Sequence, residues 1–416
     1  MAASYYTGFP VYEERDRIGG TAYSYSREGF VFDVGIHVLQ SNKKYFHDLM
    51  ENLGVEFVQH KRNAWIYSHG SYAAYPFQVN TSHLPVAIRM KCVLGYLFRS
   101  GNDEPGNYEE WLVANFGKGF ALNFLIPYAE KFWRVSPKNM TFEWTDARIP
   151  RPRTVDVLKG AFRDQDTGLG TNPIFQYPSK KGAGFSAIAA SFGSKVTDIR
   201  LGMKASKIDP VDRIIHFNGG GTKTRYDYVI STLPLPVILN LFDDLPPDIS
   251  RAAKKLAFNS IAVINVAVGR NRLSDKHWIH YPGNDVSFFR INFPENFCEG
   301  LTPDNAASVQ AEISYDMDTP PESEELKEKV LLDLVKVGVL RPDEKIIFTD
   351  VVYQDYGYVI YDKHRKDAVG TIHGYLNVLG IYPCGRYGAW EYLWSDDAII
   401  SGKKAADKVA RLKAAG

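Results

Sequence analysis

Hydrophobic and polar residues along the chain follow two spacings, one typical of helices and one of strands. Apolar residues recur every three or four positions in 42–54, across most of 84–136 and in 322–337, which predicts helices with one buried face. They alternate with polar residues in 262–268 and 308–313, which predicts antiparallel strands. The mixture predicts an α/β protein.

The N-terminal segment carries the second half of a dinucleotide-binding unit. Phe9–Tyr12 reads as a strand, and Glu13, followed by Glu14, stands where such a unit places an acidic residue for the ribose. The residues that would form a cradle for the pyrophosphate are Arg17, Gly19 and Gly20.

The first half of that unit would be a strand ending in G-x-G-x-x-G. The chain as given begins instead inside what reads as the crossover helix. We therefore expect the parallel sheet to lack one strand. We also expect cofactor binding to be impaired, because each N–H contact to a pyrophosphate contributes roughly 1.5–3 kcal/mol.

The C-terminal segment has a second glycine turn. Gly385–Gly388 precedes Asp396 and Asp397, which open a helix that continues to about residue 412. A strand, a turn and a helix N-terminus present backbone N–H groups to an anion or an electron-rich ring. No G-x-S-x-G, H-E-x-x-H or cysteine pair is present, so the sequence predicts cofactor chemistry and no metal site.

Composition narrows the remaining choices. The 416 residues are 45% hydrophobic, enough for two or three packed domains, and the formal net charge is +1. Because a net charge this close to zero creates no strong electrostatic field around the protein, we expect no nucleic-acid partner. The three separated cysteines indicate a reduced, cytoplasmic protein, and no apolar run is long enough to predict a membrane span.

These signals predict three regions. A discontinuous Rossmann-like domain contains both ends of the chain, and a helical insertion and an antiparallel sheet lie between them. A Pro-, Arg- and Gly-rich stretch in the insertion reads as a lid loop. The predicted ranges are 1–45, 182–240 and 375–416 for the Rossmann-like domain, 84–181 for the insertion with its lid at 145–181, and 46–83 with 241–374 for the sheet.

Four stretches of the chain resemble the UDP-galactopyranose mutases, a family in the flavoprotein superfamily that also holds the amine oxidases and protoporphyrinogen oxidases. The resemblance covers nearly the whole length, from the Arg-Ile-Gly-Gly turn to the last helix. The stretches that carry it are Phe32–His37, Tyr75–Asn80, Pro127–Trp133 and the Gly-Arg-Tyr turn running on to Trp390 and Tyr392.

The resemblance implies a reduced FAD as cofactor and a nucleotide sugar as substrate. In that family the flavin N5 attacks the anomeric carbon of UDP-galactopyranose, and the sugar recloses as a furanose without net redox change. The sequence leaves the oligomeric state open, with a homo-oligomer as one possibility.

Positions that match the family imply roles for individual residues. Catalytic roles fall to His37, Arg148 and Arg386. Cofactor binding falls to Glu13, Glu14, Arg17, Gly19, Gly20, Gly385, Arg386 and Tyr392. Substrate binding falls to Tyr75, Phe77, Gln78, Phe124, Trp133, Arg148, Asn172, His280, Tyr281, Arg290, Tyr358 and Tyr392. Arginines suit a diphosphate, because planar guanidinium groups bind phosphate oxygens bidentately.

Three positions depart from the family pattern. Ile36 replaces a glycine and would stiffen the histidine loop. Ala129 replaces an asparagine that helps to read the nucleotide, and His280 replaces a tyrosine, for which Tyr281 could substitute. Two other interpretations stay open, an FAD-dependent oxidoreductase of the amine-oxidase or protoporphyrinogen-oxidase type and an inactive, flavin-poor relative.

Overall fold

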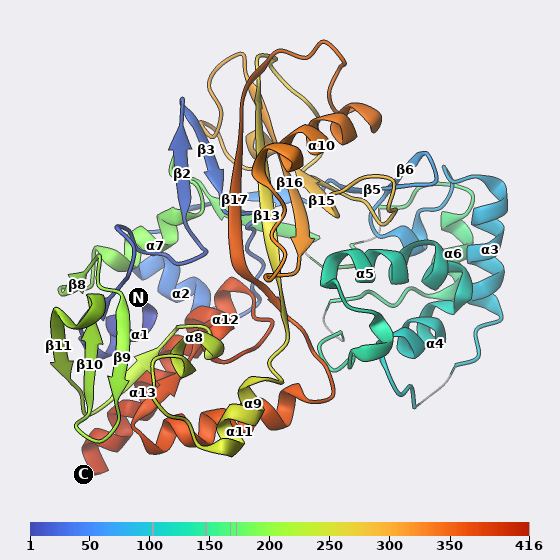
Figure 1. Ribbon diagram of the computed structural model, residues 1–416. Coiled ribbons are helices and arrows are strands. Elements are labelled where there is room, and N and C mark those ends of the chain that lie inside the picture. Colours follow the sequence, from blue (N-terminus) through green and yellow to red (C-terminus); the bar gives the residue numbers. More distant parts are fainter. Residues whose placement is uncertain (102–103, 146–147, 167, 172, 416) are drawn as a thin grey trace.

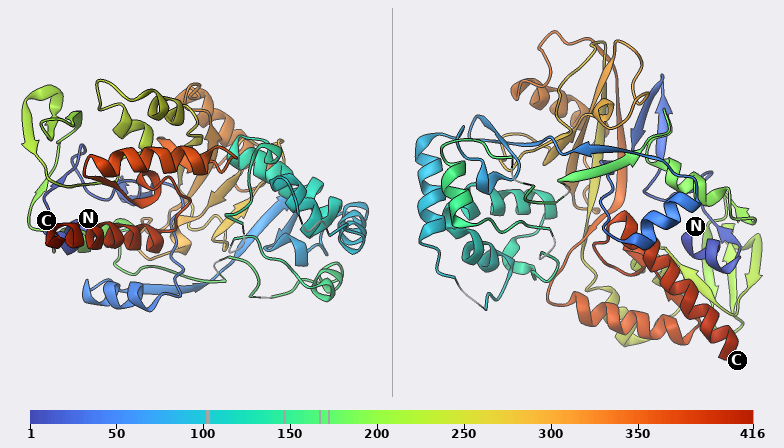
Figure 2. Two further views of the ribbon diagram at one scale, coloured as in Figure 1. Left: turned by 90° about the horizontal axis from the view of Figure 1, so that it is seen from below. Right: turned by 180° about the vertical axis from the view of Figure 1, so that it is seen from behind.

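A computed structural model describes residues 1–101, 104–145, 148–166, 168–171 and 173–415, and it has the predicted α/β fold (Figure 1). A mixed sheet stands in the centre. The helical insertion lies on one side of the sheet, and the N-terminal and C-terminal segments lie on the other side (Figures 1 and 2). The exact domain boundaries stay a prediction.

The central sheet has seven strands in the order β17-β13-β16-β15-β14-β5-β6. Every neighbouring pair is antiparallel except β14 and β5, which run parallel. The prediction of a mostly antiparallel sheet is confirmed. The parallel pair was not foreseen, because β5 joins the sheet from an early part of the chain that no local pattern links to β14. The bounds are β5 Ala64–Ser68, β6 Ser71–Ala74, β13 Phe258–Val268, β14 Trp278–His280, β15 Arg290–Asn292, β16 Ala307–Tyr315 and β17 Ile346–Val359.

The two faces of the sheet differ in chemistry, because side chains alternate along each strand. One face is apolar, with Ile279 buried in the core that helix α10 (Ser323–Lys336) shares. On the other face, His280 lies opposite Arg290, and Arg290 lies opposite Glu312. The register therefore aligns three polar side chains in one row across β14, β15 and β16.

The Rossmann-like part contains two parallel strand pairs, β1 with β8 and β12 with β18, beside the antiparallel sheet β11-β10-β9. Helix α1 packs along α13. Among the described residues no strand joins the two parallel pairs, and the predicted missing strand stays a prediction. The bounds are α1 Ala2–Thr7, β1 Val11–Tyr12, β8 Ile199–Arg200, β9 Ala205–Asp209, β10 Ile214–Phe217, β11 Thr222–Arg225, β12 Val229–Ser231, β18 Ile381–Pro383 and α13 Ser395–Ala415.

The helical insertion is packed tightly at glycines. Gly117 has a φ of 74°, and a Cβ there would lie 1.8 Å from the carbonyl oxygen of Gly95, so α3 and α4 meet backbone to backbone. The segment predicted as an irregular lid contains helix α6 and strand β7, and β7 pairs with β4. The bounds are β4 Phe57–Lys61, α3 Val86–Leu97, α4 Tyr108–Phe120, a π-helical turn Ala121–Leu125, α5 Ile126–Trp133, α6 Thr154–Gly160 and β7 Ile174–Pro178.

The remaining elements connect these parts. The hairpin of β2 and β3 leads into the loop that carries His37, and α12 carries Arg386. No helix in the described ranges is both long and apolar enough to cross a bilayer. The bounds are β2 Ser24–Arg27, β3 Phe30–Asp33, α2 Lys44–Asn52, α7 Ser186–Gly193, α8 Leu235–Leu239, α9 Pro247–Ala253, α11 Arg365–Val378 and α12 Gly385–Gly388.

Candidate active site

A buried ion pair lies at the centre of the polar row. The Nε–H of Arg290 donates to Oε2 of Glu312, and the two side chains are 16% and 4% exposed. Burial alone would lower the pKa of Arg290, but the Glu312 carboxylate and the nearby phenols of Tyr358 and Tyr128 raise it. Arg290 therefore stays charged, and the remaining N–H groups of its guanidinium can serve a ligand.

The second oxygen of Glu312 reaches the loop after β3. Its Oε1 accepts a hydrogen bond from the Ile36 N–H at 2.9 Å. Gly35 has a φ of 80°, and a Cβ there would lie 2.9 Å from the same oxygen, so this loop conformation favours glycine. His37 follows, with Nδ1 3.0 Å from the carbonyl oxygen of Gly35. Burial lowers the pKa of His37, so the imidazole is neutral near pH 7.

Hydrogen bonds fix the tautomer of His280. The indole Nε1–H of Trp278 can only donate, and it lies 3.1 Å from Nε2 of His280. Burial, with Arg290 and Arg62 nearby, lowers the pKa of His280 to about 3, so the ring is neutral and its proton sits on Nδ1. That N–H donates to the hydroxyl oxygen of Tyr128, 2.8 Å away. The Tyr128 hydroxyl hydrogen is therefore not used by His280.

Two further arginines meet tyrosines beside this row. Arg386 donates from Nε and Nη2 to the Leu393 carbonyl oxygen, and its Cζ lies 5.9 Å from the Tyr358 ring and 5.7 Å from the Tyr392 ring. Arg148 stacks on Tyr392, with Cζ 3.9 Å from the ring centroid. Burial raises the pKa of Tyr358, so its hydroxyl stays protonated and can donate. The structure thus brings together four residues from three separate segments of the chain.

Aromatic side chains form a wall next to the tyrosines. The Trp133 ring lies 5.5 Å from Tyr392 and 5.8 Å from Tyr358. Phe124 stacks near Tyr128 at 5.8 Å, and Tyr75 lies 5.8 Å from His280. The predicted residues Trp133, Phe124 and Tyr75 therefore border the same region as the polar row.

Other predicted substrate residues lie elsewhere. Tyr281 is 1% exposed and packs against Phe288 on the apolar face of the sheet, so it cannot substitute for a tyrosine at His280. Phe77 is fully buried behind Phe124. Gln78 is also buried, and its Oε1 has no hydrogen-bond partner in the described part of the chain. The predicted residue Asn172 lies outside the described residues.

The predicted pyrophosphate cradle forms a loop between β1 and β2. Glu13 accepts a backbone hydrogen bond at 3.0 Å, Glu14 is exposed, and Arg17 lies with Cζ 4.2 Å over a tyrosine ring. Gly19 and Gly20 have φ values of 114° and 59°, and a Cβ on Gly19 would lie 3.1 Å from a backbone oxygen. Such glycines let a phosphate approach the backbone closely, so these residues fit the pyrophosphate end of a dinucleotide.

The second glycine turn lies near the first. Gly385 has a φ of 74°, and its N–H donates to Ser401 Oγ at 3.0 Å. Burial lowers the pKa of the Met1 amino group, while Cys384, next to this turn, and Glu13, in the first loop, both act on it electrostatically and raise it. The two halves of the predicted cofactor site therefore converge at the N-terminal end of α1.

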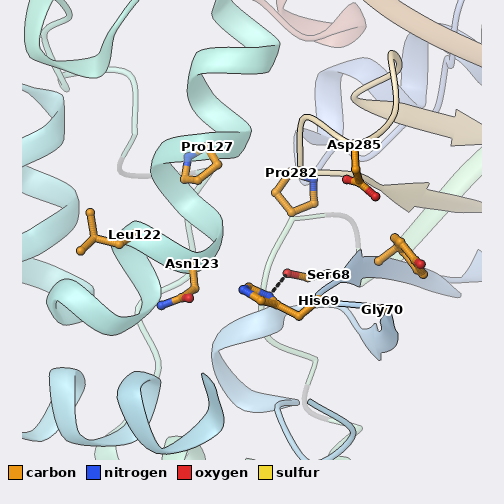
Figure 3. A pocket seen from close by; sticks show the side chains of 10 residues that line it. Ser68, His69, Gly70, Leu122, Asn123, Pro127, Pro282 and Asp285 are labelled. Carbon is orange, nitrogen blue, oxygen red and sulfur yellow. Dashed lines mark hydrogen bonds between the residues drawn. The ribbon is translucent and has the colours of Figure 1, made fainter. Parts of the chain in front are cut away.

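A separate cleft of about 320 Å³ opens between the insertion and the sheet (Figure 3). Leu122, Asn123 and Pro127 line it from the insertion, and His69 and Asp285 line it from the loops around the sheet. None of the predicted site residues that the structure describes lines this cleft.

Sequence reasoning missed three residues of this region. Glu312 is the only carboxylate in the alternating stretch 308–313, and a lone acid on a buried strand was a usable signal. Tyr128 lies inside the motif Pro127–Trp133 but received no role. Arg62, whose Cζ lies 4.6 Å over the Tyr75 ring, had no sequence signal.

The family follows from comparison with known proteins. Residues 9–410 match the family model of the flavin-containing amine oxidoreductases. The chain belongs to this family. It is therefore an enzyme of the flavin amine-oxidase superfamily, as the resemblance predicted.

Solved structures share the fold of this family member. A crystal structure of reduced UDP-galactopyranose mutase is 27% identical, with a TM-score of 0.92 over 99% of this chain and 91% of that chain. A putative protoporphyrinogen oxidase from an Exiguobacterium species is 17% identical, with a TM-score of 0.74 over 98% and 95%. Putrescine oxidase bound to putrescine is 14% identical, with a TM-score of 0.67 over 99% and 96%. The last two show the fold alone, and the first confirms the predicted resemblance.

Proposed function

We propose that the protein is a flavin-dependent mutase that interconverts the pyranose and furanose forms of a nucleotide-activated sugar, of the UDP-galactopyranose and UDP-galactofuranose type. The observation that carries this proposal is the buried Arg290–Glu312 pair, with Arg386 and two tyrosines beside it. Several fixed cations and phenol donors suit a diphosphate. Similarity to a UDP-galactopyranose mutase supports the same choice.

Different side chains would contact different parts of the substrate. Arg290 and Arg148 would bind diphosphate oxygens, and Tyr358 would donate its hydroxyl hydrogen to the same group. Trp133 and Phe124 offer aromatic faces for the nucleobase. Because Arg148 stacks on Tyr392, it can order that side of the site when the diphosphate arrives.

The cofactor that would fit is FAD, and the Glu13–Gly20 loop and the Gly385 turn would hold it. In its reduced form it would supply the nucleophile for the anomeric carbon. The protein supplies charge and hydrogen bonds around that carbon. The Nδ1–H of His37 donates to a carbonyl oxygen, so Nε2 keeps its lone pair. The neutral ring can therefore accept a hydrogen bond or a proton beside the cofactor.

A second candidate is an FAD-dependent oxidoreductase of the amine-oxidase type, which the family match supports. Hydride transfer from an amine does not need a cationic diphosphate site. An inactive relative with little flavin is the third reading, and the absorbance spectrum of the purified protein would identify it by the lack of flavin bands.

The deciding experiment follows conversion of UDP-galactofuranose by the dithionite-reduced holoenzyme, with products separated by chromatography. We expect Arg290→Ala to lower kcat/KM by roughly 10- to 150-fold, the value of one charged hydrogen bond. Arg270→Ala is a matched control, because Arg270 forms a comparable ion pair with Glu344 outside the polar row. Amine-dependent peroxide formation without sugar conversion would instead establish the oxidoreductase.

A further inference from the structure

The outer edge of the helical insertion exposes large apolar side chains. Half of the sixteen large apolar residues that are exposed in the described ranges lie on or next to helices α3 and α6 (Figure 1). Phe98 and Phe162 are each 83% exposed. The eight residues, which we call the α3–α6 patch, are Val86, Met90, Leu94, Leu97, Phe98, Val155, Leu158 and Phe162.

The patch is continuous across the two helices. On α3 the exposed residues recur at helical spacing, whereas Cys92 and Tyr96 on the opposite side are buried in the core. Tyr96 donates to the Pro152 carbonyl oxygen before α6, and Arg89 donates to the Ala161 carbonyl oxygen after it. These two bonds hold α3 and α6 antiparallel and side by side. The apolar stripe of each helix therefore borders that of the other along the length of α6, which is about 10 Å.

The two segments that form this apolar surface are rich in basic residues. Residues 86–99 and 151–164 together carry a net charge of +5, while the whole chain carries only +1. The two acidic residues in these ranges are already engaged, Asp156 by Arg153 and Asp164 by His83. The patch thus combines exposed apolar groups with a local excess of positive charge.

We propose that the α3–α6 patch docks the protein onto the surface of an anionic lipid bilayer. Such a surface offers hydrocarbon for Phe98 and Phe162 and negative headgroups for the lysines and arginines. A second copy of the chain fits less well, because a two-fold axis would place the same +5 surface against itself. The docking is peripheral, since the patch lies on a folded surface and the helices that form it are short.

The test is sedimentation with lipid vesicles, using the flavin-loaded protein at about 0.1 M salt. We expect binding to phosphatidylcholine vesicles that contain about 30% phosphatidylserine, and at least about tenfold weaker binding to phosphatidylcholine alone. Phe98→Ser with Phe162→Ser should weaken binding by about tenfold or more, because both rings leave the bilayer. Lys91→Ala should weaken it by roughly fivefold, the effect of one basic residue near the headgroups.

The matched control replaces Val211 and Val378 by serine, because these residues are 89% and 81% exposed but lie outside the patch. The control variant should bind vesicles like the wild type. Absence of binding to the anionic vesicles would overturn the proposal, and so would equal loss in both double variants. Analytical ultracentrifugation tests whether a second copy of the chain covers the patch instead. If the wild type is a dimer and Phe98→Ser with Phe162→Ser makes it a monomer, a second copy covers the patch and the proposal is overturned.

Discussion

Deleting the hydroxyl of Tyr128 tests the hydrogen-bond chain that the sheet builds. Tyr128→Phe keeps the ring, which stacks 5.8 Å from Phe124 and 5.9 Å from Phe132, and removes only one oxygen. Trp278 fixes the proton of His280 on Nδ1, so the Tyr128 hydroxyl hydrogen must find its acceptor elsewhere. Arg290 acts electrostatically on this hydroxyl, and a phosphate oxygen of the proposed substrate would be its acceptor.

The magnitude follows from the charge of that acceptor. A hydrogen bond to a charged group contributes roughly 1.5–3 kcal/mol, so UDP should bind Tyr128→Phe roughly 10- to 150-fold more weakly. Isothermal titration of UDP into holoenzyme measures this directly. The pKa of His280 is lowered to about 3 by burial first, so the loss should be the same at every pH between about 5 and 8.

Tyr281→Phe is the matched control, because Tyr281 lies one residue from His280 but on the apolar face of the same sheet. It should leave UDP affinity unchanged. If Tyr128→Phe binds UDP within about twofold of the wild type, the hydroxyl makes no bond to the ligand and the assigned direction of the chain is wrong.

Two further predictions concern stability. Glu312→Ala should lower the free energy of unfolding by about 3–5 kcal/mol, because it leaves Arg290 as a buried unpaired charge, and Glu312→Gln should cost less; urea unfolding measures both. Burial raises the pKa of Glu295 from 4.5 to about 7, so the folded state holds this proton more tightly than the unfolded state does. Its contribution to stability is therefore full below about pH 4.5 and is lost as pH rises to about 7, which amounts to at most about 3 kcal/mol. Glu295→Gln should remove this loss of stability at high pH. Urea unfolding of both proteins at pH 5 and pH 8 measures the effect. If the variant loses as much stability between these pH values as the wild type does, this account is wrong.

Local patterns predicted the elements that local forces determine. Helices α2 and α10 follow from helical spacing and strand β13 from alternation, each over fewer than twenty residues, and all three are present. Strand β7 and the parallel pairing of β14 with β5 were not predicted. In both cases the paired strands are more than a hundred residues apart in sequence. Such pairing depends on how whole surfaces pack in the fold, so the sequence of one segment does not predict it.

Some residues of the candidate site could likewise be predicted from the sequence, and others could not. Resemblance to a family located Arg290, Arg386 and Tyr358, because motifs are local in sequence. It also suggested Tyr281, which the structure places on the wrong face, because a shift of one residue along a strand reverses the direction of a side chain. Glu312 escaped notice because its importance depends on the register that sets it opposite Arg290.

Glu312 also changes the meaning of the residue at position 36. The sequence suggested that Ile36 stiffens the histidine loop through its branched side chain. In the structure the loop is held through the backbone N–H of Ile36, which a glycine would offer equally well. The tie therefore comes from Glu312 and not from the side chain at 36. Any displacement of His37 that moves Ile36 must break its bond to Glu312 or carry the carboxylate with it, and in both cases the partner of Arg290 changes. A movement of the His37 loop, beside the proposed cofactor site, would therefore change the contacts of Arg290 in the proposed diphosphate site, because Glu312 binds both.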